Sequence, residues 1–155
     1  MLHRPLTESD IARCVEIERA SSDYPWAESI FRRSLKQRHW AFVTINSADQ
    51  LMAFCVCQRV ADECSVLNLA VDPIWQRQGF GRNLLKAGLV AAHAEGAQHA
   101  FLEVRQSNRA AQALYEAMGF DLLGLRENYY PVNSENSYEH ALLMGLDLTT
   151  WHVTE

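Results

Sequence analysis

The feature that most constrains the fold is a short apolar run followed at once by a glycine-containing turn and a helical pattern. The run from Val66 to Val71 is apolar apart from Asn68, and it is short enough to form a strand buried on both faces. Asp72-Pro73 ends the run, because proline cannot extend a strand ladder and restricts the residue before it. A helical pattern begins near Arg82. The stretch therefore predicts a central strand–turn–helix unit.

Gly79 and Gly81 stand at the start of this helical pattern. Glycine lets backbone N–H groups come close to an anion, and the helix dipole adds a favourable potential there. Two common phosphate motifs do not fit: a dinucleotide fingerprint needs a third glycine where Leu84 stands, and the chain has no Gly-Lys-Ser/Thr run. An ordinary turn is the alternative. We interpret the turn as a site for a phosphate-bearing ligand.

Composition bounds the class of protein. The 155 residues predict a single domain over 1–148 with a short C-terminal tail over 149–155 that we expect to be frayed. The 48% hydrophobic and 21% charged content is ordinary for a soluble protein, and a net charge of −5 argues against nonspecific nucleic-acid binding. The N-terminal segment lacks the apolar core of a signal peptide, and no apolar run approaches the ~18 residues of a membrane span. We expect a cytoplasmic protein without a membrane partner.

Cysteine and histidine spacing gives no sign of a metal site. Cys14, Cys55, Cys57 and Cys64 form no C-x-x-C pair, so reduced, packed thiols are expected and zinc is not. The six histidines show neither ligand nor triad spacing. No metal cofactor is predicted.

Hydrophobic periodicity predicts an α/β protein with elements in the order β-α-α-β-β-β-α-β-α-β-β. The predicted strands cover residues 2–6, 39–45, 51–60, 64–71, 99–104, 120–126 and 140–148. The predicted helices cover residues 11–20, 28–37, 82–95 and 108–118. The segment over 127–138 is predicted to contain a loop.

Several stretches resemble a known family. Gln76, Gly79 and Gly81 meet the pattern Gln/Arg-x-x-Gly-x-Gly/Ala, which is similar to the acyl-coenzyme-A signature of the GCN5-related N-acetyltransferase (GNAT) superfamily. The order of elements is also that of the GNAT fold, and this resemblance implies a mixed sheet with helices on both faces. The resemblance narrows to the RimI family of bacterial ribosomal-protein N-terminal alanine acetyltransferases. The stretches that carry it are Tyr24-Pro25-Trp26, 68–73, 76–82, 102–108, 113–116, 118–120 and 126–131.

The resemblance implies a site for acetyl-CoA between two splayed central strands, those over 66–71 and 99–104. The pantetheine arm would pair with backbone groups of the first strand, and the pyrophosphate would lie in the glycine turn. From its position alone Asn108 is most simply a helix cap. The implied coenzyme-binding residues are Leu69, Ala70, Val71, Arg77, Gln78, Gly79, Phe80, Gly81, Arg82 and Asn108.

Acetyl transfer to an amine needs two proton operations. The ammonium group must lose a proton before its nitrogen attacks the thioester, and the departing thiolate benefits from receiving one. The resemblance implies that Glu103 is the base and Tyr115 the acid. Taken alone, a glutamate at a strand end is usually a solvated charge, and a tyrosine on an apolar helix face is usually a core residue. Because no activated cysteine is evident, we expect direct attack without an acyl-enzyme.

The resemblance also implies the acceptor, which is the N-terminal alanine of ribosomal small-subunit protein eighteen. It places two aromatic loops, Pro25-Trp26 and Tyr129-Tyr130, around the incoming peptide. Alternatively, Trp26 staples the second helix and the two tyrosines pack against the last strand. The segment over 132–138 departs from the family pattern, so substrate preference stays open, as does the oligomeric state. Action on a small-molecule amine or a lysine, or a regulatory coenzyme-A-binding module without turnover, are the alternative functions.

Overall fold

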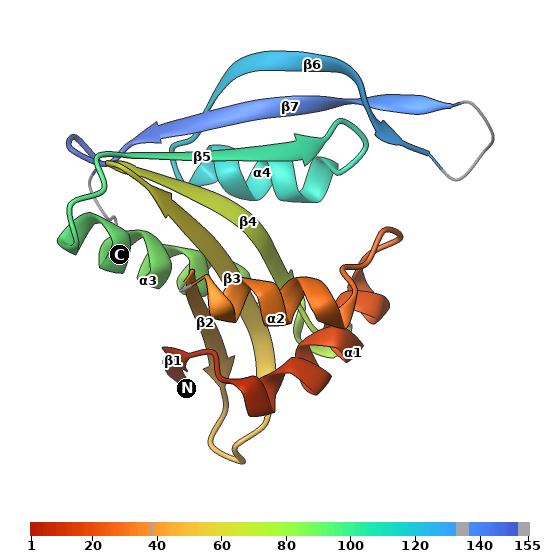
Figure 1. Cartoon of the computed structure of the whole chain (residues 1–155), viewed down its shortest axis with the longest axis vertical. Coiled ribbons are helices and arrows are strands. Elements are labelled where there is room, and N and C mark those ends of the chain that lie inside the picture. The colour runs from red at the N-terminus through yellow and green to blue at the C-terminus, as the bar shows by residue number, and fades with distance from the viewer. Residues whose placement is uncertain (38, 133–136, 152–155) are drawn as a thin grey trace.

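The computed structural model describes residues 1–37, 39–132 and 137–151, and these form a seven-stranded mixed sheet with the order β1-β2-β3-β4-β5-β7-β6 (Figure 1). The predicted α/β class and order of elements are confirmed. The strands are β1 Leu2–Pro5, β2 Trp40–Ile45, β3 Leu51–Val60, β4 Glu63–Val71, β5 His99–Arg105, β6 Asp121–Pro131 and β7 Tyr138–Asp147. The helices are α1 Ile11–Ser21, α2 Glu28–Lys36, α3 Phe80–Ala94 and α4 Arg109–Ala117, with 3-10 turns η1 Glu8–Asp10 and η2 Pro73–Trp75.

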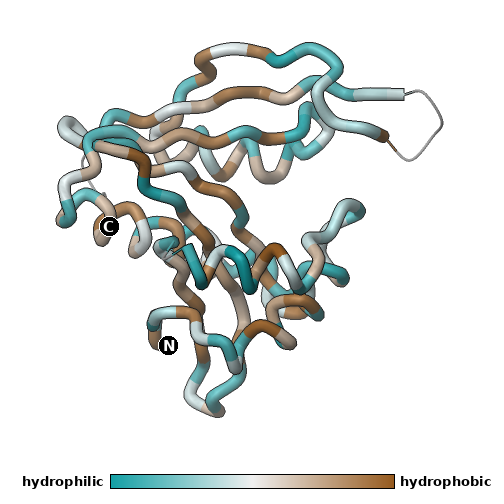
Figure 2. The backbone as a smooth tube through the Cα atoms, in the orientation of Figure 1, coloured by the Kyte–Doolittle hydropathy of each residue, from teal (hydrophilic) through white to brown (hydrophobic). Residues whose placement is uncertain are grey.

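Two hydrophobic clusters hold the helices on the two faces of the sheet. β3 lies inside the sheet between β2 and β4, and its side chains alternate between the clusters, so its first seven residues are buried and appear as hydrophobic tube in Figure 2. Cys55 faces the cluster that contains Leu85 of α3 and Tyr115 of α4. Phe54 faces the other cluster, with Phe31 of α2.

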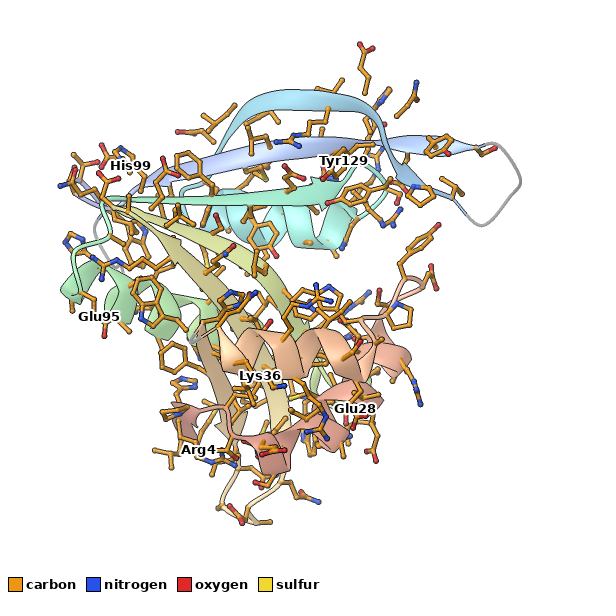
Figure 3. All side chains as sticks on the ribbon, viewed as in Figure 1. Arg4, Glu28, Lys36, Glu95, His99 and Tyr129 are labelled. Carbon is orange, nitrogen blue, oxygen red and sulfur yellow. The ribbon has the colours of Figure 1, made fainter. Side chains whose placement is uncertain are left out.

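Helix α2 shows why the helices adopt these positions. Phe31 is buried on its inner side, whereas Glu28 and Lys36 are exposed and lie on the outside of the molecule (Figure 3). This amphipathic pattern drives the apolar side onto the sheet. Among the helices of the described ranges, none combines the length and apolar character needed to cross a membrane.

β4 and β5 are paired over only part of their length. Their parallel register runs from Glu63 with His99 to Val66 with Leu102, and beyond that point the two strands diverge (Figure 1). A β-bulge at Leu67 causes a shift in the register of β4 against β3. Because a bulge bends the strand that carries it, the second half of β4 turns away from β5.

This divergence overturns the expectation that residues 66–71 form a strand buried on both faces. Leu67 is 38% exposed, and Asn68, Leu69 and Val71 are only half-buried. Periodicity and length predicted the strand correctly. They did not reveal the bulge, because it depends on the pairing with β3.

The strand predicted over residues 120–126 is too short at its C-terminal end. β6 continues to Pro131, so Tyr129 and Tyr130 lie on a strand paired with β7. The register is irregular between Arg126 and Tyr130, where Asn128 has a φ of 49° and its N–H donates to His140 Nδ1 at 3.0 Å. Of the divergent segment over 132–138, residues 133–136 lie outside the described residues.

The C-terminal tail is anchored further than the sequence predicted. Trp151 packs against the α3–α4 cluster, and its indole N–H donates to the Met118 carbonyl at 3.0 Å. The expectation of fraying is therefore wrong as far as Trp151, while residues 152–155 lie outside the described part of the chain. All four cysteines are buried as free thiols, as expected.

Candidate functional site

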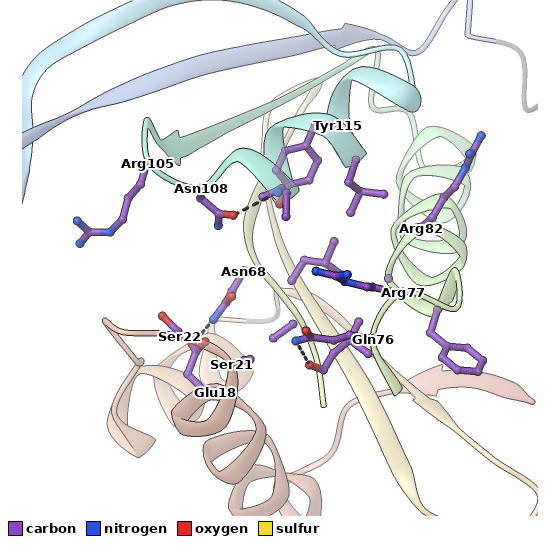
Figure 4. Close-up of a pocket in the computed structure, with 18 of the residues that line it drawn as sticks. Glu18, Ser21, Ser22, Asn68, Gln76, Arg77, Arg82, Arg105, Asn108 and Tyr115 are labelled. Carbon is purple, nitrogen blue, oxygen red and sulfur yellow. Dashed lines mark hydrogen bonds between the residues drawn. The ribbon is translucent and has the colours of Figure 1, made fainter. Parts of the chain in front are cut away.

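A cavity of about 690 Å³ lies where β4 and β5 diverge (Figure 4). Its wall is formed by the C-terminal end of α1 and the following loop, the second half of β4, the turn before α3, and the start of α4. The charged residues of the wall are Glu18 on α1, Asp23 in the loop after it, Arg77 in the turn before α3, Arg82 in the first turn of α3, and Arg105 at the end of β5. This size suits a small-molecule ligand.

The glycine turn forms the basic end of the cavity, and its two glycines serve different needs. Gly79 is the N-cap of α3 with φ +86°, a left-handed conformation that disfavours any side chain. Gly81 lies against β4, because a Cβ there would be 3.2 Å from Val71 Cγ2. The N-terminal N–H groups of α3 therefore face the cavity close to the end of β4, as an anion site requires.

Side chains fix this turn to the end of β4. The Gln76 side-chain amide donates to the Val71 carbonyl at 3.0 Å. The Asp72 carboxylate accepts from the Ile74 N–H at 3.1 Å and is paired with Arg13 of α1. The position of the predicted phosphate site is thus set by both β4 and α1.

Nine of the ten predicted coenzyme-binding residues lie together around this cavity, and Gln78 is the exception. Asn108 caps α4, since its side-chain oxygen accepts from the Ala111 N–H at 3.2 Å, and it also lines the cavity. The residues brought together are Leu69, Ala70, Val71, Arg77, Gly79, Phe80, Gly81, Arg82 and Asn108.

Tyr115, the predicted acid, lines the cavity from α4. It is 8% exposed and packs against Phe120 with 5.8 Å between ring centroids. Burial raises the pKa of its phenol, so the hydroxyl keeps its proton at neutral pH. A buried, protonated phenol facing the cavity is available to donate a proton or a hydrogen bond.

Glu103, the predicted base, does not line the cavity. It extends from β5 on the side opposite to Leu102 and Val104, which face the α3–α4 cluster, and its carboxylate forms an ion pair with Arg126 Nε at 3.1 Å. Glu103 and Tyr115 therefore lie on opposite faces of β5. Both residues lie close to the place where β4 and β5 diverge, but only Tyr115 lines the cavity there.

Arg105 joins the loop after α1 to the C-terminal strands. Its guanidinium lies 3.4 Å from the ring centroid of Tyr24 and 4.4 Å from that of Tyr130. It also donates to the Pro131 carbonyl at 3.1 Å and pairs with Glu139 at 3.4 Å. Cation–π contacts on both sides hold this corner of the cavity together.

None of the four predicted peptide-binding residues, Pro25, Trp26, Tyr129 and Tyr130, lines the cavity. Trp26 contacts Phe31 of α2 edge-on at 5.3 Å, as expected if it staples that helix. Tyr129 is 47% exposed and contacts Tyr130 at 5.0 Å. Burial and the nearby Glu103 carboxylate raise the pKa of Tyr130. These four residues therefore lie outside the cavity lining, and their role in peptide binding stays a prediction.

Sequence reasoning missed Glu18, which lies inside the cavity and is only 4% exposed. Figure 4 shows Glu18 and Asn68 directed toward each other, and Asn68 Nδ2 donates to Glu18 Oε2. Burial raises the pKa of the Glu18 carboxyl. Helical periodicity could have identified it, because the spacing of Ile11, Cys14 and Glu18 places all three on one buried side of α1. A charged residue on a buried side is unusual.

Comparisons with known proteins give consistent results. The model of the acetyltransferase (GNAT) family matches residues 11–120. A ribosomal protein bS18-alanine N-acetyltransferase of Haemophilus ducreyi is 38% identical over 92% of this chain and 97% of its own length, and the protein of that name from Escherichia coli strain K12 is 37% identical over 93% and 95%. The crystal structure of the ribosomal-protein-S18-alanine N-acetyltransferase from Escherichia coli has a TM-score of 0.86 at 35% identity, covering 99% of this chain and 96% of that one.

Proposed function

Because this chain belongs to the acetyltransferase (GNAT) family, we propose that it transfers the acetyl group of acetyl-CoA to the N-terminal alanine of ribosomal protein bS18. The resemblance that the sequence motifs predicted is confirmed. The observation that carries the proposal is similarity along almost the whole chain to enzymes named for this reaction. The cavity at the diverging strands supports it.

Acetyl-CoA fits the two ends of this cavity. Its pyrophosphate would lie against the N-terminus of α3, where Arg77 and Arg82 add positive charge. Its pantetheine arm carries amide groups, which can pair with the β4 backbone beyond Val66, where the register with β5 has ended. This arrangement brings the thioester between β4 and Tyr115 of α4.

In the proposed mechanism, the acceptor amine attacks the thioester carbonyl directly. Glu103 takes the proton that the ammonium group loses, through a water molecule because its carboxylate does not line the cavity. Tyr115 donates a proton to the departing thiolate of coenzyme A. The products are the N-acetylated protein and coenzyme A.

The cysteines support direct transfer rather than a covalent intermediate. A nucleophilic cysteine needs an accessible thiol with a lowered pKa. All four thiols are buried here, and burial raises the pKa of Cys14 to about 12. The pKa of Cys57 and that of Cys64 are also raised, mainly by hydrogen bonding between cysteine sulfurs and by burial. No acetyl-cysteine is expected to accumulate during turnover.

The first test is acetyl transfer from labelled acetyl-CoA to peptides with free N-termini that differ in their first residue, with N-blocked lysine peptides as controls. Transfer to the α-amine of alanine-first peptides is the expected result. Coenzyme binding without transfer to any peptide would contradict the proposal and favour a small amine as acceptor or a module without turnover.

A variant tests the assignment of the base. Glu103→Gln is expected to lower kcat by roughly 10²–10⁴-fold, the usual contribution of general base catalysis, while the affinity for acetyl-CoA is unchanged. The matched control is Glu116→Gln, which removes an exposed carboxylate from α4. Equal rates for Glu103→Gln and the control would exclude Glu103 as the base.

A further inference from the structure

Glu18 is a charged residue that the proposed mechanism leaves without a task. It lies on the side of α1 that packs onto the sheet, and it is 4% exposed. Burying a carboxylate is unfavourable unless hydrogen bonds or an opposite charge compensate it. The described part of the chain offers Glu18 no ion pair, and hydrogen bonds to one of its two oxygens compensate its burial only in part.

The two carboxylate oxygens of Glu18 have different surroundings. Oε2 accepts from Asn68 Nδ2 and from the Trp26 N–H at 3.2 Å, and these bonds fix the side chain between β4 and the loop after α1. Oε1 accepts no hydrogen bond from any described residue. Because Oε1 is not fully buried, it remains accessible from the cavity.

Charge is divided between the two ends of the cavity. Arg77 in the turn before α3 and Arg82 in the first turn of α3 lie where a phosphate-bearing ligand would bind. Glu18 and Asp23 lie at the α1 end, and the charge of Arg105, which contacts Tyr24 there, is paired with Glu139. A cationic group entering the cavity beside the coenzyme would therefore be attracted to the α1 end.

We propose that Glu18 is a substrate-binding residue whose Oε1 accepts a hydrogen bond from the N-terminal amino group of the acceptor. The inference rests on the proposed function and names the part of the cavity that holds the amine. Asn68 follows the β4 bulge and precedes Leu69, Ala70 and Val71, so the carboxylate it orients lies beside the strand segment assigned to the pantetheine arm. Glu18 would bring the amine to the thioester, and Glu103 would remove its proton.

The variant Glu18→Gln is suited to test this role. Its amide oxygen can still accept from Asn68 and the Trp26 N–H, so the local scaffold is retained. Its amide N–H₂ then replaces Oε1 and opposes an amino group instead of accepting from it. Glu16→Gln is the matched control, because Glu16 is exposed on the same helix.

The measurement is calorimetric binding, in the presence of coenzyme A, of an alanine-first peptide and of the same peptide with a hydroxyl in place of its N-terminal amine. The wild-type protein and Glu16→Gln are expected to prefer the amine peptide by about 10- to 100-fold, the range for a hydrogen bond to a charged group. Glu18→Gln is expected to lose this preference while its affinity for coenzyme A is unchanged. Glu18→Asp, which keeps the charge, should retain part of it.

Two results would overturn the inference. One is an intact preference in Glu18→Gln, and the other is equal binding of the two peptides by the wild-type protein, which needs no variant to fold. A purely structural role would lower the melting temperature without changing the preference. Failure of the proposed function is distinct, since the wild-type protein would then transfer acetyl to no peptide α-amine.

Discussion

Gly79→Ala isolates the backbone requirement of the turn before α3. The residue has φ +86° and ψ 4°, and its carbonyl accepts the Asn83 N–H at 3.0 Å in the first turn of the helix. A Cβ at Gly79 would meet no atom within 4 Å. Any effect of the substitution must therefore come from the left-handed backbone and not from a steric clash with another residue.

The magnitude follows from two opposing terms. A non-glycine residue in the left-handed region costs about 1–2 kcal/mol. The smaller conformational freedom of alanine in the unfolded chain offsets about 0.4–1 kcal/mol of this. The free energy of unfolding should fall by about 1 kcal/mol, which for a chain of this size lowers the melting temperature by roughly 2–4 °C.

Coenzyme binding should respond more strongly than stability. If the turn relaxes to a negative φ, the N–H groups at the start of α3 no longer converge on one anion, and affinity for coenzyme A falls. Asparagine tolerates the left-handed region better than alanine. Gly79→Asn should therefore be less harmful than Gly79→Ala in both measurements.

The assay combines urea denaturation with calorimetric titration of coenzyme A for the wild-type protein and the two variants. The order wild type, Gly79→Asn, Gly79→Ala is expected for both stability and affinity. If Gly79→Ala were as stable and bound coenzyme A as tightly as wild type, or if asparagine were worse than alanine, the argument from φ would be refuted.

Three further predictions concern stability. Burial raises the pKa of Tyr115, so above about pH 10 the unfolded state loses a proton that the folded state keeps, and the free energy of unfolding should fall as the pH rises. In Tyr115→Phe the melting temperature should fall less steeply with pH over this range. The Arg4 guanidinium holds the pKa of Asp10 below its ordinary value, so the free energy of unfolding should fall as the pH drops below about 4. Asp10→Asn should weaken this dependence on pH, and an unchanged dependence would argue against the Arg4–Asp10 pair. Gly145→Ala places a Cβ 2.6 Å from Leu123 Cδ1 and 3.2 Å from the Phe101 ring. Urea titration should show a free energy of unfolding lower by about 1 kcal/mol or more. No loss of stability would mean that both side chains shift freely.

Much of the cavity end at the turn before α3, the proposed coenzyme site, could be predicted from local sequence. The alternation that defines β4, the glycines before α3 and the cap at Asn108 all act over a few residues, so their consequences follow from backbone chemistry alone. The structure brings nearly all of these residues around one cavity. Gln78, which occupies the same turn, does not line it.

The α1 end of the cavity, which is proposed to hold the acceptor amine, could not be predicted in the same way. Glu18 and Asn68 are 50 positions apart in the chain, and no periodicity relates them. Glu103 was singled out by resemblance, but its ion pair with Arg126 depends on the register of β5, β7 and β6. Tyr129 and Tyr130 were expected on a loop, whereas pairing with β7 extends β6 through them.

By itself, the sequence determined the order of helices and strands, most of the residues that face the core, and the glycine turn for which phosphate binding is proposed. These properties depend on side-chain periodicity and on backbone preferences within a few residues. Only the tertiary structure decided that the bulge at Leu67 separates β4 from β5 and that the cavity so opened has an acidic end at Glu18. The physical reason is that strand register and the burial of a charge are settled by contacts between segments distant in the chain, which no local pattern encodes.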